Sequence, residues 1–400
     1  MFWRDRFKAM TRQVIIFCIV VAPIGAKAVD QTTIPADDSV VLEVLPRSLW
    51  GKRDVLVSLQ SRLKENPTDA LLAFQVATFF VDAGDEGSDP RFYGFARASL
   101  QPWWNTKIVP PPILRLRAKL KEKEHQYDEA IDDLLLLTRS RPDDGQAIIE
   151  LVNLYRLQGK FSKAKYKSDQ LAQFATEVPV AISRVPLDAV SGKAEKALAT
   201  LERLTPKIEA DFPATMTWVR MTQAETSEIL GRYDDAIKFY EDALQASPQS
   251  FSVKRAFSDL LIHQKRFDDV ITMVEQDLID DGCLLMAAVA ARGAAQTDKA
   301  KLWTDQLKQR FDETRQRGDQ PHRRFVTRYF LDLTDNPKLA LSESLANWAN
   351  QKELVDARLV LRSAIADGRP ESAQPVIDFL RECKCQDAAS AQLISELEKM

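Results

Sequence analysis

Residues 218–248 read WVRMTQAETSEILGRYDDAIKFYEDALQASP and carry a pattern that recurs along the chain. The aromatic residue Tyr233 is followed by two variable residues and the small residue Ala236, with Gly231 five positions before Ala236 and Pro248 twelve positions after it. A small residue lets two helices approach closely, glycine tolerates the positive φ that ends a helix, and proline stops one. These residues therefore predict a pair of helices joined by a tight turn at Gly231.

The same pattern recurs with a period near 34 residues. Small residues that follow this spacing are Ala96, Ala130 and Ala164, and later Ala236 and Val270. Weaker copies centre on Ala197, Ala300, Ala340 and Ala373. A period of this length is typical of proteins in which each helical hairpin packs on its neighbours.

A second small residue stands twelve positions before the first in several copies, on the first helix of the expected pair. It is Ala118, Ala224, Ser258 or Ala288. Other copies have Val152, Val185, Arg328 or Leu361 at this position, so we expect those hairpins to pack less regularly.

On these residues the chain resembles the tetratricopeptide repeat family. The resemblance covers about residues 55–385; it is clear in 112–175 and 214–275 and degenerate in 280–385. It implies an all-α fold, a right-handed α-solenoid of about nine helical hairpins with a concave and a convex face. Residues 89–104 also resemble a signature of exported bacterial repeat proteins.

The expected organisation has three parts: residues 1–28, 29–49 and 50–399. Residues 29–49 are polar, contain proline and lack helical periodicity, so we expect a mobile lead-in there. Within 50–399 we expect helices at 54–65, 68–83 and 90–101, an enlarged turn at 85–88, helix pairs at 112–139, 145–174, 178–204, 213–246, 251–279, 283–312, 321–348 and 353–382, and a capping helix at 387–399.

The first 28 residues have the pattern of a secretory signal peptide. The apolar run Val14–Ala26 is followed by Lys27 and Ala28 and preceded by four basic residues, Arg4, Arg6, Lys8 and Arg12. A run of this length suits a signal peptide, whereas a membrane span needs about 20 apolar residues. We expect cleavage after Ala28 and a periplasmic or otherwise exported protein, with an uncleaved anchor as the alternative.

Composition excludes several classes of protein. At 45% hydrophobic and 28% charged residues, the chain is neither disordered nor a polytopic membrane protein. Its net charge of −3, with no block of Lys and Arg, makes nucleic acid a poor partner. Cys283, Cys383 and Cys385 are an odd number of thiols after signal cleavage, and we expect no stabilising disulfide framework.

No motif for catalysis, metal binding or nucleotide binding stands out. The three histidines, His125, His263 and His322, fall in different repeats, and Cys383 and Cys385 lack the two-residue spacing of a metal or redox motif. The sequence therefore predicts a non-enzymatic protein without a cofactor or metal, with a degenerate enzyme as a third reading.

The resemblance implies that the first helix of each pair lines the concave face. The candidate partner-binding residues there are Arg115, Lys119, Asn153, Arg156, Trp218, Glu225 and Arg255. The first four form a basic and amide cluster suited to an acidic side chain or a C-terminal carboxylate of a peptide, although it does not reproduce the carboxylate clamp of chaperone-binding relatives. Trp103 and Trp104 are either core residues or an exposed aromatic anchor.

These observations favour an exported scaffold that binds a polypeptide on its concave face, in the assembly or regulation of an envelope protein. The alternative is a module that binds glycan, peptidoglycan or a small molecule near Trp103.

Overall fold

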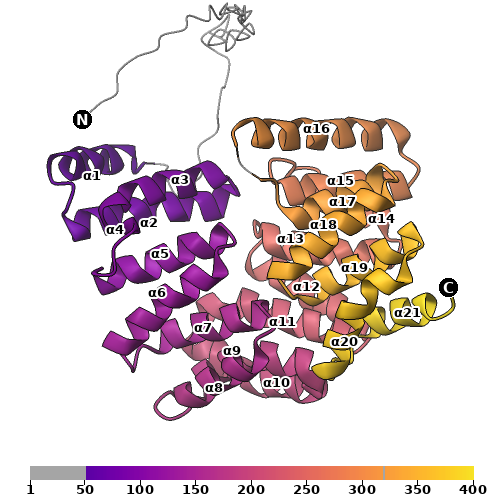
Figure 1. The fold of residues 1–400 in the computed structure, drawn as a ribbon, viewed down its shortest axis with the longest axis horizontal. Coiled ribbons are helices and arrows are strands. Elements are labelled where there is room, and N and C mark those ends of the chain that lie inside the picture. The colour runs from indigo at the N-terminus through magenta and orange to yellow at the C-terminus, as the bar shows by residue number, and fades with distance from the viewer. Residues whose placement is uncertain (1–50, 319) are drawn as a thin grey trace, which may run out of the picture. The chain divides into compact units, whose positions relative to one another are not determined.

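The computed structural model describes residues 51–318 and 320–400, which belong to one compact unit, Leu45–Met400. The expected signal peptide, residues 1–28, and the expected lead-in, residues 29–49, lie outside the described residues. Every element in the described part of the chain is helical, as Figure 1 shows. The prediction of an all-α solenoid is confirmed.

Helices pack as consecutive pairs. The unit opens with α1 (Arg53–Glu65), α2 (Ala70–Gly87), α3 (Pro90–Ser99) and the short α4 (Gln101–Trp104). The next pairs are α5 (Pro111–Lys123) with α6 (Tyr127–Ser140), α7 (Gly145–Leu157) with α8 (Phe161–Leu171), α9 (Glu177–Asp188) with α10 (Ala194–Asp211), and α11 (Met216–Ile229) with α12 (Tyr233–Ala246). They are followed by α13 (Phe251–His263) with α14 (Phe267–Val274), α15 (Asp281–Gly293) with α16 (Thr297–Gln316), α17 (Arg323–Arg328) with α18 (Pro337–Asn350), α19 (Leu354–Asp367) with α20 (Gln374–Glu382), and α21 (Ala388–Leu397). π-helical or 3₁₀ turns occupy Ala189–Lys193, Pro213–Thr215, Tyr329–Leu333 and Pro370–Ala373.

The α11–α12 hairpin shows why these residues fold this way. Ala224 and Ala236 are both fully buried and belong to the same core cluster, so small side chains bring the two helices together. Gly231 adopts φ +70° at the turn, and the N–H of Arg232 donates to the carbonyl of Ser227 over 2.8 Å. This pattern satisfies carbonyl groups at the end of α11 and lets α12 begin two residues later.

One expected turn is wrong. Residues 85–88 are not an enlarged turn, because α2 continues to Gly87. Ser88 then takes a left-handed conformation, and the Asp89 side chain accepts a hydrogen bond from the N–H of Arg91 to begin α3. The connection between the helices is therefore short.

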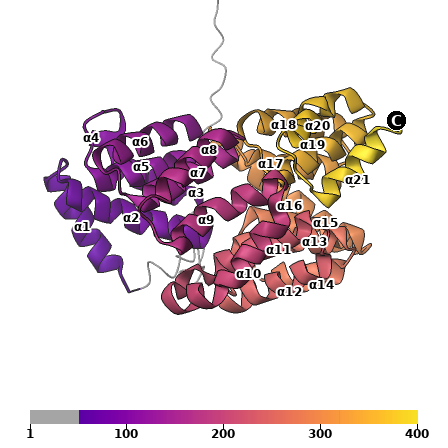
Figure 2. The same ribbon diagram turned by 90° about the horizontal axis from the view of Figure 1, so that it is seen from below.

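The last helices pack against the turns of earlier hairpins. A Cβ on Gly159 would lie 2.7 Å from the ring of Phe379, and one on Gly192 would lie 2.7 Å from the carbonyl oxygen of Lys384. The yellow helices at the C-terminal end lie next to α11 in Figures 1 and 2, and α21 contacts α11 directly. Repeats far apart in sequence are therefore neighbours within this unit.

A second long-range contact joins the start of the unit to its middle. The Ser88 hydroxyl, at the end of α2, donates to the Asp280 carboxylate at the start of α15 over 2.5 Å. Within residues 51–318 and 320–400, no helix is both long and apolar enough to span a membrane.

Candidate functional site

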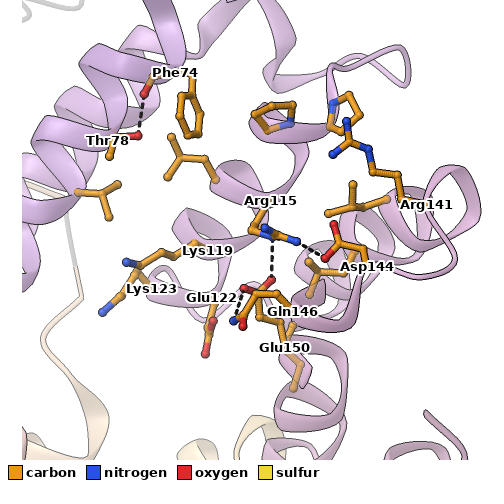
Figure 3. A pocket seen from close by; sticks show the side chains of 18 of the residues that line it. Phe74, Thr78, Arg115, Lys119, Glu122, Lys123, Arg141, Asp144, Gln146 and Glu150 are labelled. Atoms are coloured by element: carbon orange, nitrogen blue, oxygen red, sulfur yellow. Dashed lines mark hydrogen bonds and ion pairs between the residues drawn. The ribbon is translucent and has the colours of Figure 1, made fainter. Parts of the chain in front are cut away.

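Two hollows lie on the inner surface of the stacked hairpins. The amino-terminal hollow, of about 670 Å³, is lined by α2, α5, α6 and α7 and is shown in Figure 3. The central hollow, of about 460 Å³, is lined by α7, α11, α13, α17 and α19. Both volumes are in the range of ligand-binding cavities.

The structure divides the predicted concave-face residues between these hollows. Arg115 and Lys119 line the amino-terminal hollow. The central hollow is lined by Asn153, Arg156, Trp218, Glu225 and Arg255. The predicted basic cluster is therefore not one site, since its four members line two different cavities.

In the amino-terminal hollow, the predicted basic residues already bind carboxylates. Arg115 pairs with Asp144 and lies 3.6 Å from Glu150, as Figure 3 shows. Lys119 binds Asp85 over 2.7 Å. Arg115 and Lys119 therefore both have carboxylate partners within the protein, so neither is available to bind the carboxylate of a ligand without breaking an internal ion pair.

Arg156 in the central hollow has internal partners as well. It donates to Asn153 Oδ1 over 2.9 Å, and its guanidinium lies 3.6 Å from Glu353. The second partner comes from the residue before α19, almost two hundred residues further along the chain. The sequence pattern placed Arg156 and Asn153 in the same candidate cluster, but it had no means to find Glu353.

Three charged groups that line the amino-terminal hollow are free: Asp82, Glu122 and Arg141 have no side-chain hydrogen bond or ion pair with any residue of 51–318 and 320–400. Burial raises the pKa of Glu122, against the effect of Lys123 and Lys119. Although burial also acts on Asp85, the hydrogen bonds from the same two lysines lower its pKa below the usual value.

Between these charges the lining is apolar. The apolar side chains come from four helices, α2, α5, α6 and α7; they include Phe74, Val81, Pro111, Pro112, Leu116, Leu134, Leu137 and Leu154. An apolar floor with a few polar groups is typical of a binding cavity. The amino-terminal hollow therefore suits a ligand that is apolar in its middle and charged at its ends.

The wall of the central hollow formed by α17 and α19 was missed by sequence reasoning. Arg324 binds Glu353 and Asp356, each over 2.8 Å. Arg358 binds Asp387 and lies 3.6 Å from Glu228. Arg328 binds Asp259 over 2.5 Å and Asp332 over 2.7 Å. Arg362 also binds Asp332, over 2.6 Å. Arg255 binds Asp280 over 2.6 Å.

One residue of the sequence, Arg328, could have indicated the ion pairs of this wall. Arg328 replaces the small residue of other repeats, and its side chain is only 3% exposed. A buried guanidinium requires carboxylate partners, because its desolvation is otherwise costly. The departure at Arg328 therefore marked an ion-pair network as well as a less regular hairpin.

Trp103 and Trp104 are both core residues. They are 9% and 8% exposed, and the guanidinium of Arg97 lies 4.6 Å from the centre of the Trp104 ring. The Arg117 guanidinium binds the carbonyl oxygens of both tryptophans. The structure leaves little of either ring open to a ligand, contrary to the anchor interpretation.

The histidines give no metal site in the described part of the chain. His125 and His322 come from different repeats, yet their ring centres lie 4.9 Å apart. Burial lowers the pKa of both, so both are neutral at pH 7. Among residues 51–318 and 320–400, no group of three or more His, Cys, Asp or Glu side chains is arranged to hold a metal ion.

Residues 229–292, which span α12 to α15, match the family model of the tetratricopeptide repeat. This part of the chain is a tetratricopeptide repeat region. No curated protein matches its sequence. Tetratricopeptide repeat proteins are typically non-catalytic scaffolds for protein–protein interaction.

Solved structures similar to this chain include a human IFIT1 dimer with PPP-AAAA. The two chains are 11% identical, with a TM-score of 0.50 over 82% of this chain and 78% of IFIT1. Yeast Tom70 is 12% identical, with a TM-score of 0.42 over 87% of this chain and 85% of its own. A tetratricopeptide repeat protein from Thermus thermophilus is 17% identical, with a TM-score of 0.38 over 48% of this chain and 97% of its own.

Proposed function

We propose that this protein is an exported scaffold that binds a polypeptide segment in the amino-terminal hollow, in the assembly or regulation of an envelope protein. The observation that carries the proposal is the combination of an apolar floor with charges that have no partner among the described residues, Asp82, Glu122 and Arg141, in a cavity of about 670 Å³. The mechanism is reversible binding, with no chemical step.

The chemistry of the hollow narrows the kind of segment. Apolar side chains of the partner bury against Phe74 and Leu116, and this burial supplies most of the binding free energy. An acidic residue of the partner pairs with Arg141, and a basic or amide residue faces Glu122. Such charges set orientation and specificity more than affinity.

Site-specific photocrosslinking in cells tests the binding surface. A photoreactive phenylalanine derivative replaces Gln146, which is exposed and lines the hollow, and in a matched control it replaces Glu209, which is exposed on α10 outside both hollows. We expect a defined partner to crosslink from position 146 and not from position 209. Equal crosslinking from both positions would contradict the proposal.

A charge reversal at Arg141 tests the role of the free cation. Arg141 is exposed and without an ion pair to the described residues, so Arg141→Glu leaves the fold intact and is expected to weaken crosslinking from position 146 at least tenfold. Reversal at Arg115 is a poorer test, because it breaks the internal pair with Asp144.

Export rests on the sequence pattern of the first 28 residues. We propose that the mature chain begins at Val29, in the periplasm or outside the cell. Mass spectrometry of the purified native protein tests this directly: an N-terminal peptide that starts at Val29 supports export, and one that starts at Met1 contradicts it.

A further inference from the structure

One carboxylate that lines the central hollow has no bonded partner within the described part of the chain. All five arginines that line this hollow lie within 4 Å of a carboxylate. Glu225 also lines it, but its carboxylate makes no hydrogen bond or ion pair with a residue of the described part of the chain. Glu225 is an exposed residue, although the protein around its carboxylate partly desolvates it.

The ion-pair network around this hollow has more acidic than basic groups. The arginines of the lining and Arg362 are six guanidinium groups, whereas the lining and its bonded partners include eight carboxylates. The unpaired Glu225 belongs to this excess. A cation that entered the hollow would be attracted, and an anion would be repelled.

Glu225 stands at the end of an apolar stripe. Trp218, Met221 and Glu225 all line the hollow from α11, at positions that place them on one face of the helix. At 1.5 Å per residue, the stripe extends about 10 Å from Trp218 to Glu225. Val190 and Leu354 line the hollow too, and they pack against the same core cluster as Trp218.

We propose that the central hollow binds an alkyl chain that ends in an ammonium group, with the chain along Trp218 and Met221 and the ammonium on Glu225. The apolar part of the ligand is removed from water against the stripe. The ammonium satisfies the free carboxylate with charge-assisted hydrogen bonds. A lysine side chain of a polypeptide and a free alkylamine share this chemistry.

The titration of Glu225 supports the same assignment. The protein around the hollow desolvates its carboxylate and raises its pKa to about 7, and the negative charges of Glu353 and Glu228 add to the effect. Arg156 and Arg358 oppose it. An ammonium ligand stabilises the ionised carboxylate, so we expect tighter binding at pH 8 than at pH 6.

Calorimetric titration of the full-length mature protein at pH 8 tests the proposal. The probes are n-hexylamine, the neutral 1-hexanol, hexanoate, and the peptide acetyl-Ala-Lys-Ala-amide. We expect n-hexylamine to bind at least ten times more tightly than 1-hexanol, and hexanoate to bind most weakly. Binding of the peptide together with n-hexylamine indicates a polypeptide lysine as the source, and binding of n-hexylamine alone indicates a free amine.

Three variants complete the test. Glu225→Gln keeps the shape of the side chain and is expected to abolish the preference for n-hexylamine over 1-hexanol, whereas Glu225→Asp keeps the charge and part of the preference. Glu209→Gln, on the exposed side of α10, is the matched control and should bind as the wild type does. No preference for the amine in the wild type, or an undiminished preference in Glu225→Gln, overturns the proposal. If Glu225→Gln fails to fold, the affinities for n-hexylamine and 1-hexanol are compared in the wild type and in Glu225→Asp, and the absence of a preference for the amine in the wild type still overturns the proposal.

Discussion

The Tyr127 hydroxyl donates a hydrogen bond to Gln351 Oε1 over 3.0 Å, although 224 residues separate the two along the chain. Beside it, the backbone N–H of Lys352 donates to the carbonyl oxygen of Leu157 over 2.7 Å. These bonds fasten the C-terminal repeats to the turns of earlier hairpins. Because α17 and α19 form one wall of the central hollow, this contact helps to hold that wall in place.

Gly159→Ala should destabilise the protein more than Gly368→Ala. Both glycines have a positive φ, which costs an alanine about 1–2 kcal/mol. Only Gly159 is also crowded, since a Cβ there would lie 2.7 Å from Phe379 and 2.8 Å from Lys352, while nothing lies within 4 Å at Gly368. We expect an additional loss of about 1–3 kcal/mol at Gly159. Urea unfolding measures the difference, and equal losses would show that the contact with the C-terminal repeats is loose.

Arg324→Met should destabilise the packing of α17 against α19. The Asp356 carboxylate is fully buried beside Arg324, so the substitution leaves a buried charge unpaired at a cost of about 3–5 kcal/mol. Arg203→Met is the matched control, because the pair of Arg203 with Glu177 is more than half exposed on both sides and contributes little. Thermal unfolding of both variants checks the prediction. An unchanged melting temperature for Arg324→Met would mean that the carboxylates are satisfied in another way.

The hairpins could be predicted from the sequence because each one is encoded locally. The pair expected at 213–246 is found as Met216–Ile229 and Tyr233–Ala246, and Gly231 marks its turn. A repeat places its small, aromatic and glycine residues a few positions apart, so one short window contains the whole signal.

The candidate sites could not be predicted in the same way, because their partners are distant in sequence. The curvature of the stack brings Asp259 to Arg328 and Glu353 to Arg156, and no spacing within one repeat shows this. The tryptophans illustrate a second limit. Trp103 and Trp104 both reach the core because the short α4 turns there and Arg117 binds their carbonyl oxygens, and that arrangement depends on a different helix.

Glu228 should contribute a loss of stability as pH rises from about 4.5 to 7, and Glu228→Gln should remove this contribution. Burial raises the pKa of Glu228 to about 7, with Asp259 and Asp387 adding to the effect and Arg358 and Tyr240 opposing it. Between the unfolded pKa, near 4.5, and the folded one, the folded chain binds more protons than the unfolded chain, so the free energy of unfolding decreases with pH. Glutamine keeps the hydrogen bond with the Tyr240 hydroxyl but does not titrate.

We expect the decrease between pH 5 and 8 to be about 2 kcal/mol smaller in Glu228→Gln than in the wild type. Urea midpoints at several pH values measure it. Parallel curves for the two proteins would show that the carboxylate has its ordinary pKa in the folded state.

Cys383 should be the first thiol among Cys283, Cys383 and Cys385 to react with iodoacetamide at pH 8. A hydrogen bond from the Cys385 thiol lowers the pKa of Cys383, while the same bond and burial raise the pKa of Cys385. Cys283 is fully buried, and burial raises its pKa too. Because the thiolate is the reactive form, peptide mapping after brief alkylation should find the label on Cys383. Cys385→Ser weakens the stabilising hydrogen bond and should slow the reaction at Cys383. Labelling of Cys283 before Cys383 in the wild type would contradict the prediction, and it would mean that α15 opens to solvent more readily than the turn before α21.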